Sequence, residues 1–203
     1  QNKKINVHIA RQALRYELFQ AATEVCESVI QWDHRLMNYH QKDHQVELTF
    51  EKGDGSAVTH RADVLVGADG IRSQVRQQLI PSHRLSLRYL GCIVILGICP
   101  LKDLDKVDPT FEHLLDGETV FQTADGTTRI YVMPYSEAEC MWQLSFPIQE
   151  VDAQSLSSNG PVALQQEAVR RCGKWHSPVS DILTKTPLNL VPGYPVYDRA
   201  ILR

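Results

Sequence analysis

The run ADVLVGADGIRSQVRQQL, residues 62–79, constrains the fold of this chain most strongly. Its first six residues, Ala62–Gly67, have the apolar composition of a buried strand. The Ala-Asp-Gly sequence that follows predicts a tight turn, because Gly70 adopts a positive φ without penalty. Val75 and Leu79 then share one face of a short helix. A strand that passes through a tight turn directly into a helix indicates an α/β fold.

This turn supports two interpretations. In open α/β sheets, ligands bind at the carboxyl ends of the strands, and free backbone N–H groups at the start of the next helix favour phosphate. Asp69 would repel a phosphate unless its carboxylate binds a sugar hydroxyl, a water molecule or an amide. The alternative is that Asp69 and Gly70 only close a turn, with Ser73 as the N-cap of the helix. A motif this short leaves both interpretations open.

The composition limits what the chain can be. Its 203 residues are 43% hydrophobic, which is enough to bury a core in one large domain or two small ones. A net charge of −3 gives no electrostatic reason to expect nucleic acid or an anionic membrane as a partner. The five cysteines form no Cys-x-x-Cys pair, which favours a reducing, cytoplasmic compartment over a disulfide framework or a zinc site. The longest apolar run, residues 90–101, is too short to span a bilayer, so no integral membrane segment is expected.

The hydrophobic pattern predicts helices and strands in a definite order. Apolar residues recur along one side of residues 9–29, which predicts a helix with one buried stripe. Two β-like segments follow, and the turn at Lys52–Gly55 predicts a hairpin. After a boundary near residues 82–85, the pattern becomes that of a mostly antiparallel sheet and two helices. The expected strands are 86–98, 119–126, 128–135 and 140–147, and the expected helices are 162–175 and 177–186.

Few other residues suggest a site. His40 and His44 have the i, i+4 spacing of a metal pair on a helix, but they lie between two β-like segments, which favours a solvated hairpin. The sequence holds no G-x-S-x-G, G-x-G-x-x-G or P-loop motif, and no cysteine nucleophile with a histidine nearby. Arg11 and Arg15 would ordinarily be surface cations. Because no strand precedes the first helix and residues 201–203 end without a turn or cap, we expect a fragment of a larger protein.

Three stretches of the sequence resemble one enzyme family. They are HIARQALRYELFQAA at residues 8–22, VGADGIRSQVRQQL at 66–79 and VPGYPVYDR at 191–199. Together they resemble the FAD-dependent aromatic-hydroxylase-type (class A) monooxygenases, and the second stretch is similar to the Asp-Gly motif that lies near both FAD and NAD(P)H in that family. Residues 29–51 are similar to the corresponding part of the tetracycline-inactivating monooxygenases.

The resemblance implies an α/β fold with two domains. Residues 1–84 would be part of an FAD-binding, Rossmann-like domain of the hydroxylase type. Residues 85–188 would form a substrate domain, in which a mostly antiparallel β-sheet with helices covers the isoalloxazine ring. Residues 189–203 would begin the return into the FAD-binding domain. Two parts of the family pattern are absent from this sequence, namely the first strand with G-x-G-x-x-G and the Gly-Asp motif that follows the YPVYDR-like strand.

The resemblance also implies roles for particular residues. Arg11 would contact the flavin cofactor, since a planar guanidinium recognises pyrophosphate or ribose oxygens well. Asp69 and Gly70 would line the cofactor side of the turn. Phe121 and Gln122 resemble a pair on the substrate side of the tetracycline-type enzymes, where Gln122 could donate and accept hydrogen bonds. The alternative for Gln122 is a strand glutamine that only satisfies neighbouring backbone. No catalytic residue and no metal ligand is assigned.

The activity that the resemblance implies is FAD- and NAD(P)H-dependent hydroxylation. The substrates would be molecular oxygen and a small aromatic or polycyclic organic molecule, with a flavin C4a-hydroperoxide as the hydroxylating species. The 203 residues alone would be incomplete and inactive. Two alternatives stay open: a flavoprotein-derived binding module without a cofactor, and a related flavin enzyme such as a halogenase. Neither the oligomeric state nor the choice between NADH and NADPH follows from the sequence.

Overall fold

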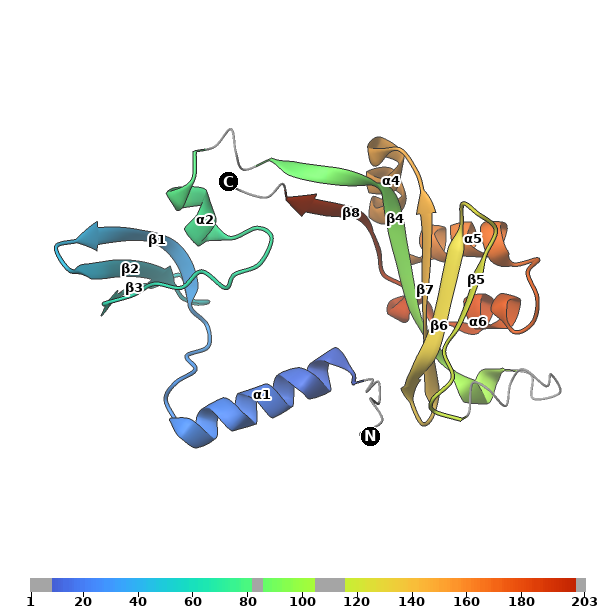
Figure 1. Cartoon of the computed structure of the whole chain (residues 1–203), viewed down its shortest axis with the longest axis horizontal. Helices are drawn as coiled ribbons and strands as arrows, with labels where there is room; N and C mark the ends of the chain where they lie inside the picture. Colours follow the sequence, from blue (N-terminus) through green and yellow to red (C-terminus); the bar gives the residue numbers. More distant parts are fainter. Residues whose placement is uncertain (1–8, 82–85, 105–115, 200–203) are drawn as a thin grey trace, which may run out of the picture. The chain divides into compact units, whose positions relative to one another are not determined.

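The structure, a computed structural model, describes residues 9–81, 86–104 and 116–199 (Figure 1). The chain divides into two compact units, which are described separately. The hairpin unit comprises the described residues of Arg11–Arg88 together with Asp198 and Arg199. The sheet unit comprises the described residues of Tyr89–Tyr197 together with Ile9 and Ala10.

The hairpin unit contains a three-stranded antiparallel sheet in the order β1-β2-β3. The strands are β1 (Arg35–Lys42), β2 (Gln45–Glu51) and β3 (Ala57–Ala62). The predicted turn at Lys52–Gly55 is confirmed, and it is closed by a 2.9 Å bond from Lys52 N–H to the Ser56 carbonyl. Helix α2 (Gln74–Leu79) lies against β1, where the Tyr39 N–H donates to Gln78 Oε1 at 3.0 Å.

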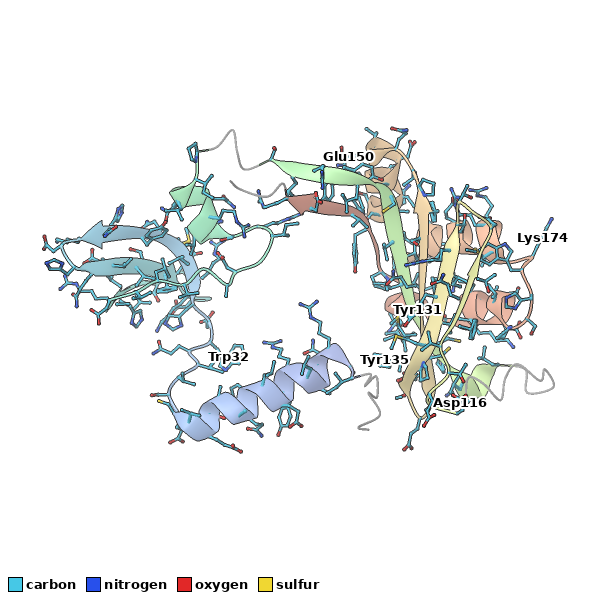
Figure 2. All side chains as sticks on the ribbon, viewed as in Figure 1. Trp32, Asp116, Tyr131, Tyr135, Glu150 and Lys174 are labelled. Atoms are coloured by element: carbon cyan, nitrogen blue, oxygen red, sulfur yellow. The ribbon has the colours of Figure 1, made fainter. Side chains whose placement is uncertain are left out.

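Helix α1 (Arg11–Val25) confirms the helix predicted within residues 9–29. Its apolar stripe, however, is not buried, since no residue of α1 is buried in the described structure. The contacts of α1 centre on Trp32 (Figure 2). The Phe19 ring lies 5.9 Å from the Trp32 ring, and the Arg15 guanidinium lies 5.2 Å from the centre of the indole. These contacts attach the helix to the segment before β1 through one aromatic side chain.

The prediction that Ala62–Gly67 is a buried strand is wrong for the described structure. Strand β3 ends at Ala62, and the residues that follow run extended toward the turn without strand pairing. Val64 is 74% exposed and Val66 is 79% exposed. Within the described ranges no strand pairs with this segment, so Val64 and Val66 face solvent despite their β-type composition, and Leu65 is half-buried.

The sheet unit contains a five-stranded sheet in the order β5-β6-β7-β4-β8. The pairs β5–β6, β6–β7 and β7–β4 are antiparallel, which confirms the predicted mostly antiparallel sheet with helices. Its strands are β4 (Leu87–Pro100), β5 (Phe121–Ala124), β6 (Arg129–Ser136), β7 (Glu139–Pro147) and β8 (Gly193–Arg199).

Three helices lie between β7 and β8 in the sequence. Helices α5 (Gly160–Cys172) and α6 (Val179–Lys185) were expected from their periodicity, whereas α4 (Glu150–Ser158) was not. Short 3-10 turns at Leu101–Asp103 and Leu188–Leu190 complete the unit. None of the helices that the structure describes is both long and apolar enough to cross a membrane.

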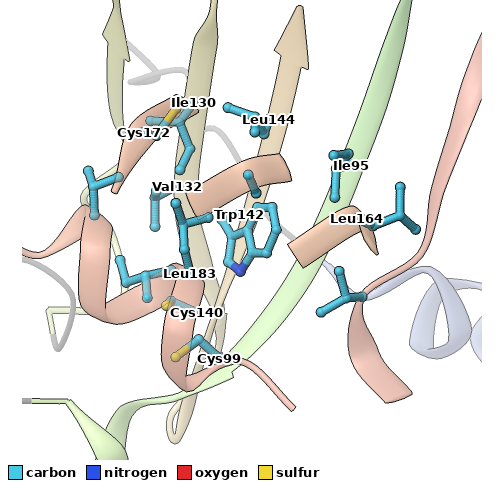
Figure 3. Close-up of a cluster of buried hydrophobic side chains, with 14 of the residues drawn as sticks. Ile95, Cys99, Ile130, Val132, Cys140, Trp142, Leu144, Leu164, Cys172 and Leu183 are labelled. Atoms are coloured by element: carbon cyan, nitrogen blue, oxygen red, sulfur yellow. The ribbon is translucent and has the colours of Figure 1, made fainter. Parts of the chain in front are cut away.

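The two faces of the sheet have different environments. Along β7, the alternate residues Cys140, Trp142, Leu144 and Phe146 are buried, and the residues between them are half-buried. The buried face packs against side chains from all three helices (Figure 3). This alternation follows from the period of two in a strand, so β4, β6 and β7 each contribute one set of side chains to the core and another to the opposite face. We call the face that does not contribute to the core the open face.

Trp142 is the largest side chain of the core. It lies opposite Gly97 of β4 in the sheet register, and a Cβ atom at position 97 would come within 2.3 Å of the indole. The indole Nε1–H donates to Thr186 Oγ1 at 2.8 Å, and the Thr186 hydroxyl donates to the Ile182 carbonyl at 2.6 Å. Gly97 therefore provides the space in which the indole reaches the end of α6.

We expect Gly97→Ala to destabilise the sheet unit by about 1–3 kcal/mol, because overpacking forces a large buried side chain out of its preferred position. Chemical denaturation, followed by tryptophan fluorescence in a background in which Trp32 and Trp175 are replaced by phenylalanine, measures this change. Ser145→Ala on the open face is the control and should change stability by less than about 0.5 kcal/mol. A Gly97→Ala protein as stable as the wild type would show that the indole is not confined by β4.

Candidate functional site

The Asp-Gly turn has the backbone conformation predicted from its sequence. Gly70 adopts a φ of +79°, in the left-handed region that favours glycine. A Cβ atom at this position would meet no other atom within 4 Å. The turn is thus held in a conformation that a larger residue would adopt only with strain, and its outer side is open to an approaching molecule.

Gly67, just before the turn, has a packing role that the sequence analysis missed. A Cβ atom at position 67 would lie 2.7 Å from the Cβ of Val75. The extended segment therefore approaches α2 more closely than any side chain would allow. A small residue immediately before an Asp-Gly turn is the sequence signal that could have indicated this contact.

Asp69 binds the start of α2. Its Oδ2 accepts hydrogen bonds from the N–H groups of Gln74 at 2.7 Å and Val75 at 3.3 Å. Ser73 is the N-cap as predicted, and its hydroxyl oxygen accepts from the Arg76 N–H at 3.0 Å. Because the chain itself satisfies these N–H groups, the helix start does not offer them to a phosphate. The sequence analysis considered a sugar hydroxyl, a water molecule or an amide as the partner of Asp69. In the structure the partners are backbone amides.

The charge of Asp69 is stabilised by the same contacts. Hydrogen bonding from the Ser73 side chain, followed by the amides of Val75 and Gln74, lowers the pKa of Asp69 below its ordinary value. The carboxylate is therefore the form that holds the turn. Its contribution to stability is present above the ordinary pKa of about 3.9 and is lost as the pH falls through the lower pKa of the folded state.

The carbonyl groups of the turn are bound by two arginines. Arg76 Nη1 donates to the carbonyls of Gly70 at 3.2 Å and Ile71 at 3.3 Å. Arg199 Nε donates to the Ile71 carbonyl at 2.7 Å. Next to Arg199, the Asp198 carboxylate pairs with Arg88, whose Nε lies 2.9 Å from Asp198 Oδ1. The end of the YPVYDR stretch thus contacts the Asp-Gly turn, a contact that sequence reasoning did not identify.

Arg11 lies at the first position of α1, and its side chain is exposed. In the part of the chain that the structure describes, Arg11 has no hydrogen bond or ion pair to Asp69, Gly70 or any other residue. An unpaired guanidinium can bind pyrophosphate or ribose oxygens through parallel N–H groups. In the described structure the Arg11 guanidinium and the outer side of Gly70 are thus unobstructed, whereas the amides at the start of α2 are already bound by Asp69.

Phe121 and Gln122 point to opposite faces of β5. Phe121 packs against the core of the sheet unit, and Gln122 is exposed on the open face. The two side chains therefore cannot contact the same bound molecule on one face of the sheet. His40 and His44 lie on β1 and in the turn that follows it, as the hairpin interpretation predicts.

We expect Asp69→Ala to speed amide hydrogen exchange at Gln74 and Val75 by about fivefold, which corresponds to the ~1 kcal/mol typical of a lost helix cap. Asp69→Asn keeps an acceptor oxygen and should have a smaller effect. Asp63→Ala, in the extended segment before the turn, is the matched control and should leave these amides unchanged. Exchange measured residue by residue checks all three variants.

The same experiment has a dependence on pH. The difference between wild type and Asp69→Asn should be constant near neutral pH and should shrink only as the pH falls below the ordinary value of about 3.9 and through the lowered pKa of Asp69 in the folded state. Equal protection of Gln74 and Val75 in wild type and Asp69→Ala at neutral pH would contradict the assignment of Asp69 as the residue that holds the turn.

Comparison with curated proteins identifies related enzymes. The chain is 29% identical over 143 residues to "Aurachin C monooxygenase/isomerase" from Stigmatella aurantiaca, a match that covers 70% of this chain and 33% of that protein. It is 35% identical over 86 residues to "FAD-dependent monooxygenase thnD" from Trichoderma harzianum, covering 41% of this chain and 20% of that protein. The chain thus matches a third or less of the length of these relatives.

Solved structures show the same fold. HpxO of Klebsiella pneumoniae, complexed with FAD and uric acid, matches with a TM-score of 0.64 and 20% identity over 91% of this chain and 43% of that one. The tetracycline destructase Tet(51) matches with a TM-score of 0.51 and 17% identity over 81% of this chain and 40% of that one. The predicted likeness to tetracycline-inactivating enzymes is therefore confirmed at the level of the fold.

The family described as "FAD binding domain" matches residues 5–153, which is most of the chain. The matched region includes α1, the Asp-Gly turn and the first four strands of the five-stranded sheet in chain order. A match over this much of the chain is sufficient to assign the family. The chain belongs to the FAD binding domain family.

Proposed function

We propose that this chain is part of an FAD-dependent monooxygenase that uses NAD(P)H and molecular oxygen to hydroxylate a small aromatic or polycyclic organic molecule. The match of the FAD binding domain family to residues 5–153 is the observation that carries this proposal. The names of the two curated relatives, both monooxygenases, support the reaction type. When bound, FAD would supply the oxidation–reduction chemistry, and the protein would bind, orient and exclude water.

The hairpin unit would contribute to the cofactor site. Arg11 is an exposed cation without a described partner, so its guanidinium is available to the phosphate or ribose oxygens of FAD. Gly70 would allow the cofactor to approach the backbone of the turn, since its outer side is open. Asp69 would act mainly through the turn, because its Oδ2 already accepts two amide hydrogens of α2.

The sheet unit would contribute to the substrate site. Its open face carries half-buried side chains, and the core helices that the structure describes contribute their buried side chains to the other face. Gln122 is on this face, where its amide can donate and accept hydrogen bonds. HpxO was solved with uric acid, a flat ring compound that carries several oxygen substituents. A substrate of comparable flatness and polarity suits an open sheet face with hydrogen-bonding side chains.

The natural protein that contains this chain should purify with bound FAD, show the absorption bands of a flavin, and consume NAD(P)H and oxygen together in the presence of substrate. Labelling with heavy-isotope oxygen gas should place one labelled atom in the product. A colourless protein without affinity for FAD would instead indicate a cofactor-free binding module. A product that forms only with chloride present would indicate a halogenase. Either result would overturn the proposal.

We expect Arg11→Ala in the natural protein to weaken FAD binding at least tenfold, which corresponds to about 1.4 kcal/mol. The melting temperature of the apo-protein should not change, because Arg11 is exposed and makes no described contact. Arg15→Ala is the control on the same helix, since the Arg15 guanidinium already lies over the Trp32 ring. Fluorescence titration of FAD measures both variants. Equal affinities in wild type and Arg11→Ala would remove Arg11 from the cofactor site.

A further inference from the structure

The open face of the sheet unit carries a row of hydrogen-bonding side chains. The strand register places Gln122 of β5 opposite Tyr131 of β6, and Tyr131 opposite Gln143 of β7. Leu96 of β4 continues the row beyond Gln143. Because residues directly opposite one another on adjacent strands project from the same face, the three polar side chains are neighbours. In the register Tyr131, which is labelled on β6 in Figure 2, stands between Gln122 and Gln143.

These three side chains have no partners among the residues that the structure describes. Tyr131 and Gln143 are half-buried and Gln122 is exposed, yet none of them makes a side-chain hydrogen bond there. None of their polar atoms is a buried unpartnered atom, so these groups are accessible and free to hydrogen-bond a ligand. A glutamine that only satisfied neighbouring backbone would make a side-chain hydrogen bond to that backbone. Gln122 makes none in the described structure, so this alternative for Gln122 is not supported.

The rows on either side of these residues differ in chemistry. On one side, Met133, Met141 and Ile98 are opposite one another in the register and form an apolar row. On the other side, Arg129 lies opposite Ser145. Methionine side chains adapt to ligands of irregular shape and contact aromatic rings favourably. The open face therefore changes from apolar through hydrogen-bonding to cationic across successive rows.

We propose that Gln122, Tyr131 and Gln143 recognise the polar edge of a flat, fused-ring substrate, and that the rings lie over Met133, Met141 and Ile98. This inference rests on the proposed function and names the substrate class of that site. Neighbouring strands are about 4.8 Å apart, which matches the separation of oxygen substituents on alternate carbons of one ring. The preferred substrate therefore carries hydroxyl or carbonyl oxygens in a 1,3 arrangement along one edge.

A matched pair of probe compounds tests this arrangement. Both 1,3-dihydroxynaphthalene and 1,5-dihydroxynaphthalene have the same rings and the same number of hydroxyl groups, but only the first has them on one edge. We expect the FAD-loaded natural protein to bind the 1,3 compound at least about tenfold more tightly, because a site built to hydrogen-bond two groups rejects a ligand that leaves one of them unpaired. Fluorescence titration measures both affinities.

The variants Tyr131→Phe and Gln143→Leu keep the size of each side chain and remove its hydrogen bonds. Each should reduce the preference for the 1,3 compound to less than about threefold, while the affinity for FAD stays at the wild-type value. Ser145→Ala, in the adjacent row, is the control and should keep the preference. A preference that is unchanged in Tyr131→Phe and Gln143→Leu, or absent from the wild type, would overturn the inference.

The outcome is separable from that of the proposed function. If the natural protein binds FAD and consumes NAD(P)H and oxygen with some substrate, but the variants retain the wild-type ligand preference, the inference fails and the proposed function stands. If the protein does not bind FAD, the proposed function fails. In that case the titration is repeated on the protein as purified, and loss of the 1,3 preference in Tyr131→Phe would still support the row as a ligand site.

Discussion

The packing of Trp142 on Gly97 determines how the sheet unit is organised. The indole fills the space that a side chain at position 97 would occupy, and its N–H reaches Thr186 at the end of α6. This contact joins the helices to one face of the sheet through a buried hydrogen bond, which is costly to leave unmade. With the helix layer attached to that face, the alternation of the strands leaves Tyr131, Gln143 and their neighbours on the other. The core and the proposed substrate face therefore depend on the same register.

In the hairpin unit, the carboxylate of Asp69 organises its surroundings as Trp142 does in the sheet unit. Asp69 satisfies the first amides of α2, and Arg76 and Arg199 bind the carbonyls of the turn. The turn is thus supported on both its donor and its acceptor sides by the chain itself. Such a turn is prepared before any ligand arrives, which reduces the conformational cost of binding. We infer that the Asp-Gly motif serves the proposed cofactor through the shape of its backbone and less through the charge of Asp69.

The exposed apolar residues of the hairpin unit contrast with the buried core of the sheet unit. Val64 and Val66 have the composition of a central strand, but in the described structure they have no strand neighbour. An unpaired, apolar extended segment offers its backbone groups and side chains to another strand. The composition of this segment predicts a strand, but the described part of the hairpin unit provides neither a neighbouring strand nor a core to bury it.

The sequence by itself determined the local elements and the family. The positive φ of Gly70, the N-cap at Ser73, the hairpin turn and the alternation of β6 and β7 all follow from interactions between residues close in the chain, which composition and period express directly. Only the tertiary structure decided which groups meet across long separations. It directed Asp69 to the amides of α2, brought Arg199 to the Ile71 carbonyl, and placed Phe121 in the core while leaving Gln122 beside Tyr131. These outcomes depend on which distant segments pack together, and a local hydrophobic pattern describes one segment at a time without naming its partner.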